Sequence, residues 1–418
     1  QLSTPTPNPN PVIADSTGTF SNIYIGGDYK VTLQDKNGSQ IFGGAEVSEL
    51  AVGNFDATII NDLSQAYIFD TVAEYQDSTI VFPVGKLIHL KDRGADFTVI
   101  AGTGTANPFN IIANTLVSQS ITVNTSNIIE TTHFGAHPTA TAAFNSGAIS
   151  AALAVAAPLG RAVHTASGSY TISVGLEVPS TLEFYGDGRL ATLFIQSALN
   201  APSTMVSTPS GSQHQNIHDI GVRFYNDTLG ASTQVGFRIV GTRRMTLKDC
   251  SVDLLDQQPD GSLWSGIGIL MDMDTVANAY TNVIEHNYVD GCQYGLWSKG
   301  PITSCTFTKN HFKTYHQMRF DRGAVLAGTT AIFGNTIYDN TLQSYSNFTH
   351  GLGNGIDFGA GDGALAFIYA FSNKIDTNYI EQNLNGILLR DGARNFSIAS
   401  QNWDNCVNEI TDLNPNKD

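Results

Sequence analysis

The sequence contains few positive charges and no long apolar run. Of its 418 residues, 21 are Lys or Arg and 37 are Asp or Glu, which gives a formal net charge of −16. A protein that binds nucleic acid or an anionic membrane needs a basic surface, so this balance argues against both partners. No stretch of 18 apolar residues is present, and we therefore expect no transmembrane helix and no membrane insertion.

Cysteine is also scarce, and its spacing does not suit a metal site. The four cysteines are Cys250, Cys292, Cys305 and Cys406, and no CxxC pair occurs among them. Structural zinc sites use short spacings between their ligands, and the histidines are scattered as well. We therefore expect no metal and no cofactor, and we interpret the cysteines as small buried apolar residues.

One phrase of the sequence occurs twice. Residues 282–296 read NVIEHNYVDGCQYGL and residues 373–387 read NKIDTNYIEQNLNGI, and nine positions match in type at the same spacing. Fainter copies surround these two, each marked by a pair of apolar or aromatic anchor residues five positions apart. The anchor pairs are Ile217/Val222, Leu247/Val252, Ile284/Val289, Phe307/Phe312, Phe333/Tyr338, Ile375/Ile380 and Ile398/Trp403.

The repeat indicates a solenoid built from strands. The shortest step between anchors is 23 residues, and each unit consists of short β-branched or aromatic runs broken by Gly, Asn and Asp, without helical periodicity. A period of this size made of strands and turns predicts a parallel β-helix. Equivalent positions on successive coils would then lie about 4.8 Å apart.

The chain before the repeats divides into smaller parts. Residues 1–50 are expected to form a β module with a Pro-rich arm, in which YKVTLQ and QIFGG pair as a hairpin around an Asn-Gly turn. Residues 51–130 read as a small connecting β domain. Residues 131–418 would hold the β-helix, which begins with an Ala-rich helix from about Ala140 to Ala157 that ends at Pro158. This helix would cap the open end of the solenoid.

The stretch PNPNPVIADSTGTFSNIYIGGDYKVTLQDKNGSQIF, within residues 5–45, resembles the small β module near the N-terminus of many phage tailspike and tail-fibre proteins. Residues 66–104 resemble the connecting domain of these proteins, and residues 131–190 resemble the start of a tailspike β-helix. The resemblance implies a right-handed, pectate-lyase-like parallel β-helix and a homotrimer. It also implies attachment to other tail or baseplate proteins of the virion through the N-terminal module, and depolymerisation of a bacterial capsule or O-antigen at the host surface.

A first outward column is expected six residues after each anchor, because strand side chains alternate between the two faces. Its members are Arg223, Asp253, Asp290, Lys313, Asp339, Glu381 and Asp404. In this alignment Asp339 lies directly beside Glu381. Like charges stacked in a sheet are destabilising, so we interpret Asp339 and Glu381 as candidate catalytic carboxylates.

A second outward column lies two residues after the glycine of each unit. It contains Arg238, Trp297, Asp357 and Leu388, with Arg319 near the same level. An indole beside a carboxylate and a guanidinium is typical of a sugar-binding groove, and Tyr294, Tyr315 and Tyr345, in the loops between, would extend it. The insertions at residues 258–264 and 344–355 are expected to project as loops, where binding residues concentrate.

Glycoside hydrolysis needs two carboxylates, about 5–5.5 Å apart for retention and about 6.5–9.5 Å apart for inversion. We predict Asp357 as the first of them, with Asp339, Glu381 or Asp391 as the second. Two other hypotheses remain open. One is a polysaccharide lyase that uses Lys313, Tyr315 or His316 as the base and Arg319 to neutralise a uronate. The other is a host-binding protein without catalysis, in which the carboxylates form a solvated surface.

Overall fold

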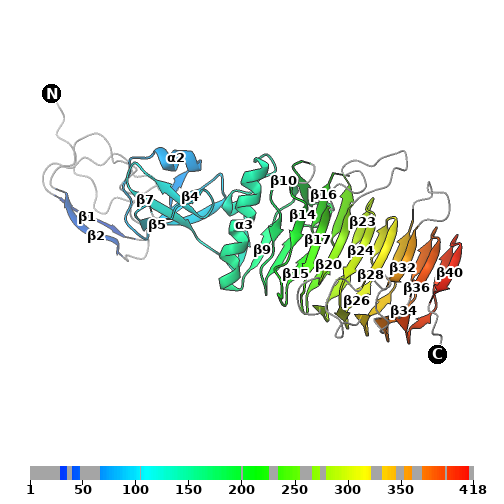
Figure 1. Cartoon of the computed structure of the whole chain (residues 1–418). Helices are drawn as coiled ribbons and strands as arrows, with labels where there is room; N and C mark the ends of the chain where they lie inside the picture. Colours follow the sequence, from blue (N-terminus) through cyan, green and yellow to red (C-terminus); the bar gives the residue numbers. More distant parts are fainter. Residues whose placement is uncertain are drawn as a thin grey trace, which may run out of the picture.

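The computed structural model shows an elongated chain that ends in a long stack of parallel strands (Figure 1). It describes residues 29–34, 40–47, 66–103, 105–198, 201–225, 234–254, 266–273, 279–321, 332–344, 353–359, 370–390 and 393–413. The predicted N-terminal hairpin is confirmed: β1 (Tyr29–Gln34) pairs antiparallel with β2 (Gln40–Val47).

A small β domain precedes the stack. Its five-stranded sheet has the order β3-β4-β5-β7-β6 and is antiparallel except between β3 and β4. The strands are β3 (Tyr67–Phe69), β4 (Leu87–Leu90), β5 (Ala95–Ala101), β6 (Ile111–Asn114) and β7 (Gln119–Val123). Helix α2 (Val72–Asp77) begins at Thr71, whose Oγ1 accepts a hydrogen bond from the Glu74 amide at 3.1 Å.

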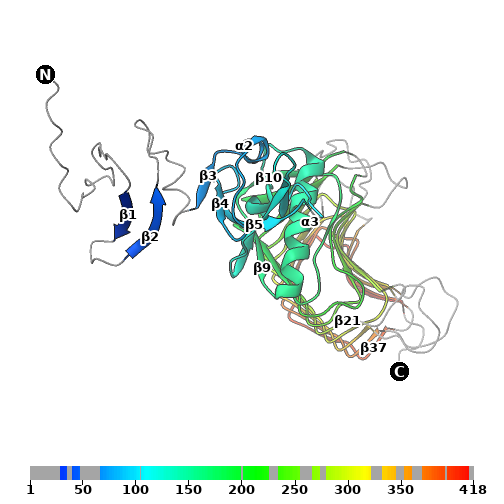
Figure 2. The same ribbon diagram turned by 90° about the vertical axis from the view of Figure 1, so that its left-hand side faces the viewer.

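Helix α3 (Ala142–Leu159) follows the short 3-10 helix η1 (Thr131–Phe134) and lies across the end of the strand stack (Figure 2). The prediction that Pro158 ends it was wrong, because Pro158 lies in the last turn and Gly160 ends the helix in a left-handed conformation with φ 59°. The helix is long and apolar enough to cross a membrane. In this fold it packs against η1 and against the first coil, at β9 (Ala162–Thr165), β10 (Gly168–Ile172) and β11 (Leu176–Glu177), and so caps the core.

The stack is a parallel β-helix, as the repeat predicts, with three long sheets and a fourth short one. Sheet I has ten strands: β8 (Ile128–Glu130), β9 (Ala162–Thr165), β12 (Glu183–Gly186), β15 (Asn216–His218), β18 (Thr246–Lys248), β22 (Val283–Glu285), β26 (Thr306–Thr308), β30 (Thr336–Tyr338), β34 (Lys374–Asp376) and β38 (Ser397–Ala399). Sheet II has nine: β10 (Gly168–Ile172), β13 (Thr192–Gln196), β16 (Gly221–Phe224), β19 (Ser251–Leu254), β23 (Tyr288–Asp290), β27 (His311–Lys313), β31 (Thr341–Gln343), β35 (Tyr379–Glu381) and β39 (Asn402–Asp404).

The other two sheets complete each coil. Sheet III has nine strands: β11 (Leu176–Glu177), β14 (Thr204–Ser207), β17 (Val235–Val240), β20 (Ile267–Asp272), β24 (Tyr294–Lys299), β28 (His316–Asp321), β32 (Asn354–Gly359), β36 (Asn385–Leu389) and β40 (Asn408–Asp412). Sheet IV has five: β21 (Ala279–Tyr280), β25 (Ile302–Thr303), β29 (Ile332–Phe333), β33 (Ala370–Phe371) and β37 (Ala393–Arg394).

The predicted anchors form two columns inside the solenoid, with one exception. Register pairs Phe307 with Ile337 and Phe312 with Leu342, so the anchors of that coil are Ile337 and Leu342 and not Phe333 and Tyr338. Phe333 instead lies in sheet IV, where its side chain is 37% exposed. The error shifts the predicted alignment of this coil by four residues.

The corner between sheets I and II is a two-residue turn in each of seven successive coils. Its first residue has a left-handed conformation, with φ between 48° and 57° for Asp219, Asp249, His286, Lys309, Asp339, Thr377 and Ser400. In four coils the second residue is a buried Asn whose Nδ2 donates to the side-chain oxygen of the next coil. These links join Asn287, Asn310, Asn340, Asn378 and Gln401 at 2.9–3.1 Å. We call them the Asn ladder.

Three of the four cysteines are buried and the fourth is partly buried, and all four are free thiols, as their interpretation as small apolar residues requires. Burial raises the pKa of Cys406 and of the three buried thiols, which makes them poor nucleophiles.

Candidate functional site

The outer face of sheet III brings together most of the residues predicted for the second column. Register places Arg238, Leu270, Trp297, Arg319, Asp357 and Leu388 in one column across β17, β20, β24, β28, β32 and β36. This confirms the predicted alignment. Two residues further along, a parallel column contains Val240, Asp272, Lys299, Asp321, Gly359 and, directly after the end of β36, Arg390. We call these two columns the sheet III face.

A glycine near the start of most of these strands makes the arrangement possible. At Gly295 an added Cβ would lie 2.9 Å from the Cβ of the core residue Phe312 and 2.6 Å from the Gln317 carbonyl oxygen. The backbone therefore approaches the core too closely for a side chain. Tyr294, one residue before the glycine, and Trp297, two residues after it, both lie on the outer side. The prediction that Tyr294 lies in a loop was wrong, because it belongs to β24.

Asp357 lies on β32, near the C-terminal end of the face. Its side chain is 2% exposed and pairs with Arg390 through both oxygens, with Nε to Oδ1 at 2.8 Å and Nη2 to Oδ2 at 2.9 Å. Asn354 Nδ2 donates to Oδ2 at 3.0 Å. The hydrogen bonds with Asp357 raise the pKa of Arg390. The pair is therefore a fixed, charge-assisted unit.

A second carboxylate, Asp321, lies on the neighbouring strand. Its Oδ2 accepts hydrogen bonds from Arg319 Nε at 2.7 Å and from Trp297 Nε1 at 2.9 Å. Its Oδ1 is buried without a hydrogen-bond partner among the described residues. Burial raises the pKa of Asp321 and the charge of Asp357 adds to the effect, although Arg319 and Trp297 oppose it.

The two carboxylates are diagonal neighbours. Arg319 pairs with Asp357 and Asp321 pairs with Gly359, so Asp321 lies one strand and two residues away from Asp357. A strand spacing of about 4.8 Å and a two-residue rise of about 6.6 Å place the two Cα atoms about 8 Å apart. Both side chains lie on the outer face, and the charge of Asp357 acts on the Asp321 carboxyl group.

Aromatic side chains lie next to these carboxylates. The rings of Tyr294 and Trp297 are 4.5 Å apart, and the Arg319 guanidinium lies 5.3 Å from the Trp297 ring centroid and 5.7 Å from that of Tyr294. Lys299 Nζ lies 4.0 Å from the centroid of Trp297 on the same strand. The Trp297 indole thus lies close to two cations and donates a hydrogen bond to one carboxylate.

His316 and Tyr315 continue the aromatic cluster. His316 stacks on Tyr294 with centroids 5.1 Å apart, and Tyr315 meets it edge-on at 4.5 Å. The backbone amide of Asn354 donates to His316 Nδ1 at 3.3 Å. Burial lowers the pKa of His316 to about 4, so the imidazole is neutral at pH 7.

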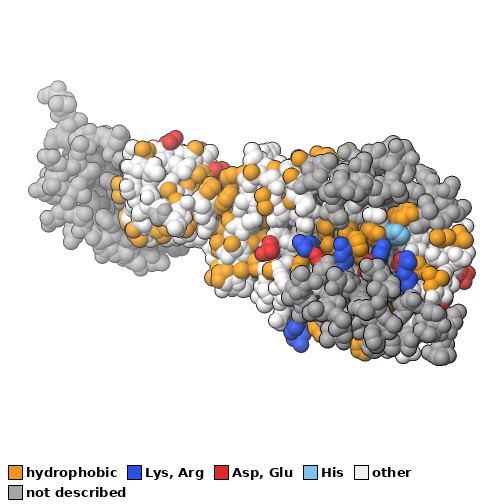
Figure 3. All heavy atoms as spheres, in the orientation of Figure 1, with side chains coloured by type: hydrophobic (Ala, Val, Ile, Leu, Met, Phe, Trp, Pro, Cys, Tyr) orange, Lys and Arg blue, Asp and Glu red, His pale blue; other side chains and the backbone are white. Residues whose placement is uncertain are grey.

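Arg238 marks the other end of the face. Its Nη2 and Nε donate to Asp272 Oδ2 at 2.6 Å and 2.9 Å. In the orientation of Figure 1 the strands of sheet III face the viewer, and the space-filling view of that side shows a row of Lys and Arg side chains beside apolar ones (Figure 3). Among the residues that the structure describes, no group of three or more His, Cys, Asp or Glu is arranged to hold a metal ion.

Two of the other predicted carboxylates, Asp339 and Glu381, do not lie on this face. Asp339 is the left-handed corner residue between sheets I and II, and its Oδ1 accepts from Thr377 Oγ1 at 2.5 Å. Glu381 lies on sheet II between Gln343 and Asp404, so the predicted contact with Asp339 was wrong; the misplaced anchors of that coil caused it. Asp391, Tyr345 and the insertion at residues 258–264 lie outside the described residues, as does most of the insertion at 344–355.

Sequence reasoning missed Asp321, Arg390 and Asp272. All three lie in the column two residues beyond the predicted one, on the same outer side of the same strands. The alternation of strand side chains could have identified them, because a residue two positions further along a strand lies on the same face of the sheet.

No family model matches the sequence, and no curated protein matches it significantly. Solved structures do match. One is the tailspike protein gp49 of Acinetobacter baumannii bacteriophage Fri1, a capsular polysaccharide depolymerase, with a TM-score of 0.55 and 10% identity over 81% of this chain and 75% of that one. Another is the full-length tailspike protein 2 of an Escherichia coli O157:H7 bacteriophage, with a TM-score of 0.57 and 14% identity over 93% of this chain and 51% of that one.

A third match is a bacterial protein. WceF of Pantoea stewartii, a glycan biofilm modifying enzyme with a tailspike-like parallel β-helix, has a TM-score of 0.52 and 11% identity over 94% of this chain and 52% of its own. The present chain thus spans about half the length of the second and third structures. At these identities the likeness concerns the architecture. This chain has the parallel β-helix fold found in phage tailspike proteins.

Proposed function

We propose that this protein is a phage tailspike that binds and depolymerises a bacterial surface polysaccharide, a capsule or an O-antigen, on its sheet III face. It would act outside the cell as a homotrimer in the virion tail, joined to other tail or baseplate proteins through its N-terminal module. The observation that carries the proposal is the row of aromatic and charged side chains around two diagonal carboxylates, Asp321 and Asp357.

The face suits a long, repetitive ligand. Trp297 and Tyr294 offer apolar ring surfaces on which the apolar side of a pyranose packs, and Arg319 and Lys299 provide donors for its hydroxyls. Strands of successive coils repeat at one spacing, so a polysaccharide can follow the solenoid axis and meet Arg238 at the other end of the same column.

The different environments of the two carboxylates support endo-glycosidic hydrolysis. In this mechanism Asp321, whose pKa is raised, donates its proton to the glycosidic oxygen of the leaving group. Asp357 Oδ1 accepts only from Arg390 Nε among the described residues, which leaves a lone pair to take a proton from the attacking water. If the carboxyl groups are as far apart as the diagonal Cα atoms, the product would have an inverted anomeric centre.

A lyase is the second candidate. His316 is neutral at pH 7 and lies beside Arg319 and Tyr315, so it can accept a proton from a uronate whose carboxylate is neutralised by the guanidinium. A binding protein without catalysis would use the same rings and charges without bond cleavage.

The test is to incubate the purified protein with surface polysaccharides from a panel of bacteria, following new reducing ends and the near-ultraviolet absorbance of unsaturated sugars. Reducing ends without that absorbance are expected. Asp321→Asn and Asp357→Asn should each lower the rate at least 100-fold, since one acid or base contributes about 10²–10⁴.

Asp339→Asn is the matched control, because it makes the same change in a left-handed corner that Asn tolerates, away from the face. The hydrolase is rejected if the products absorb as unsaturated sugars. The enzyme proposal as a whole is rejected if polysaccharides that bind are never cut.

A further inference from the structure

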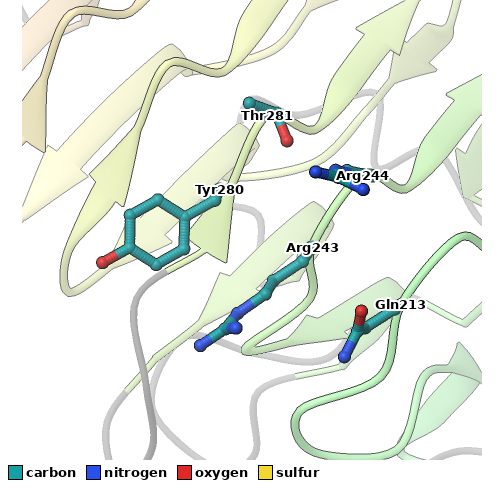
Figure 4. A pocket seen from close by; sticks show the side chains of 5 residues that line it. All are labelled: Gln213, Arg243, Arg244, Tyr280 and Thr281. Atoms are coloured by element: carbon teal, nitrogen blue, oxygen red, sulfur yellow. The ribbon is translucent and has the colours of Figure 1, made fainter.

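A pocket lies outside the sheet III face, where the chain leaves β17 and turns towards sheet I. It has a volume of about 450 Å³ and is lined by Gln213, Arg243, Arg244, Tyr280 and Thr281 (Figure 4). Pockets of a few hundred Å³ are typical of small-molecule sites. The lining consists of two guanidinium groups, an amide, a hydroxyl and a phenol ring.

Three coils hold these residues in place. Parallel bridges join Gln213 to Arg243 and Arg243 to Tyr280. The Arg243 amide donates to the Ser212 carbonyl oxygen at 3.0 Å, and the Arg244 amide donates to the Tyr280 carbonyl oxygen at 2.9 Å. Successive lining residues are therefore one strand spacing, about 4.8 Å, apart on a fixed backbone.

The two arginines differ from those on the sheet III face. There, Arg238, Arg319 and Arg390 each pair with an aspartate. Across the described part of the chain, no carboxylate lies within ion-pair distance of Arg243 or Arg244. Two adjacent cations repel each other, and a protein of net charge −16 has many carboxylates with which to neutralise them. The pocket thus concentrates positive charge that a bound anion would balance.

The side chains also suit a sugar. The Arg243 guanidinium lies 5.5 Å from the Tyr280 ring centroid, and in Figure 4 it lies between Tyr280 and Gln213. A guanidinium that lies over a ring keeps the N–H groups in its own plane free to bind a carboxylate at two points. The Gln213 amide and the Thr281 hydroxyl can donate to and accept from sugar hydroxyls.

We propose that this pocket binds the carboxylate of an acidic sugar, such as a uronate, and anchors an acidic polysaccharide beside the sheet III face. The second half of this statement rests on the proposed function, whereas binding of the acidic sugar does not. Arg243 follows Arg238 by five residues, which span at most about 18 Å. One extended oligosaccharide can therefore reach from the end of the sheet III face to the pocket.

The experiment measures calorimetric binding of an oligogalacturonate to the whole protein, to Arg243→Gln, to Arg244→Asn and to the double variant. The matched control is Lys309→Asn, because Lys309 is also an exposed cation in a left-handed turn, with φ 54° against 55° for Arg244, and it lies outside the pocket. Further titrations use the same oligomer with its carboxyl groups reduced to alcohols, and inorganic phosphate alone.

We expect the double variant to bind the oligogalacturonate at least tenfold more weakly than the wild type, and Lys309→Asn to bind it within twofold. The carboxyl-reduced oligomer should bind the wild type at least tenfold more weakly. Equal binding of that oligomer, or an equal loss in Lys309→Asn, overturns the carboxylate site. Phosphate that displaces the oligomer at equal concentration overturns its assignment to a sugar.

The outcome is separable from that of the proposed function. If oligogalacturonate binds through the arginines but no polysaccharide is cut, the pocket stands and the depolymerase fails. If polysaccharide is cut and the pocket variants bind and cut as the wild type does, the depolymerase stands and the pocket fails.

Discussion

Arg390 donates hydrogen bonds to both carboxylate oxygens of Asp357 from the neighbouring coil. The two residues are not register partners, because Asp357 pairs with Leu388 in the sheet. The guanidinium therefore reaches across the face diagonally to a carboxylate that is 2% exposed. A charge so enclosed depends on its counter-ion, because removal of one partner of a buried pair leaves the other without compensation.

The first prediction concerns this pair. Arg390→Met should lower the free energy of unfolding by about 3–5 kcal/mol, because it leaves the Asp357 carboxylate buried and alone. The double variant Arg390→Met/Asp357→Leu should recover most of the loss. Arg238→Met is the control, since its partner Asp272 is 12% exposed and retains more solvent. Denaturant unfolding of the wild type and the three variants measures these changes, and equal losses in Arg390→Met and Arg238→Met would contradict the argument.

A second prediction concerns the Asn ladder. Asn310 donates to the Ile284 carbonyl oxygen at 2.9 Å and to Asn340 Oδ1 at 3.0 Å, and it accepts from Asn287. Asn310→Ala should destabilise the protein by at least about 2 kcal/mol, since each buried group left without a partner costs about 1–3 kcal/mol. Asn402→Ala, at an exposed position of the last coil, should change stability little. Thermal unfolding of both variants decides this, and a similar effect would show that the ladder adds nothing.

A third prediction follows from His316. Its folded-state pKa is about 4 against 6.5 for the free side chain, and burial is the main cause, while Asp357 opposes it and Arg319 and Arg390 add to it. As the pH falls from 6.5 to 4, His316 is protonated in the unfolded chain before it is protonated in the folded protein. The free energy of unfolding should therefore decrease through this window, and the contribution of the neutral His316 should be fully present above pH 6.5. The loss is at most roughly 3 kcal/mol.

The pH dependence is checked by denaturant unfolding at pH 7, 5.5 and 4. His316→Gln should lose less stability than the wild type between pH 7 and 4, because Gln cannot be protonated but can accept from the Asn354 amide. His137→Gln, at an exposed histidine, should behave as the wild type does. An unchanged slope in His316→Gln would show that another group titrates.

The fourth prediction concerns Trp297. If the indole packs on a sugar ring, Trp297→Ala should weaken polysaccharide binding at least tenfold, as loss of a central aromatic contact typically costs about 2 kcal/mol or more. Trp297→Phe keeps a ring but loses the hydrogen bond to Asp321, so it should bind nearly as well and be slower in cleavage. Equal binding by Trp297→Ala in a sedimentation assay would place the glycan elsewhere.

The solenoid could be predicted well from the sequence because matching positions of the repeat become paired positions on neighbouring coils. It failed in one coil because Phe333/Tyr338 and Ile337/Leu342 are both apolar pairs five residues apart. Apolar spacing alone does not separate them. The Asn ladder separates the two pairs. Asn310 and Asn378 each follow the first anchor of their coil by three residues, and of Phe333 and Ile337 only Ile337 has an asparagine, Asn340, at that distance.

The sequence allowed us to predict which residues share the outer face of sheet III, but not how their side chains contact one another. Alternation and register place Trp297, Arg319 and Asp357 in one column without any structure. The pairing of Arg390 with Asp357 depends instead on the diagonal reach of a long side chain, and the enclosure of Asp321 depends on neighbours from two strands. Neither the Arg390–Asp357 pair nor the burial of Asp321 can be predicted from the spacing of residues in the sequence.

The two-residue corner between sheets I and II fixes where the chain can change length. The distance along the chain between ladder neighbours varies from 23 residues, Asn287 to Asn310, to 38 residues, Asn340 to Asn378, yet the corner itself stays the same. An extra residue at this corner would move the next strand by one position and turn its core side chains outward. The constant length of this corner therefore keeps the strands of successive coils in register, although the number of residues in the rest of each coil varies.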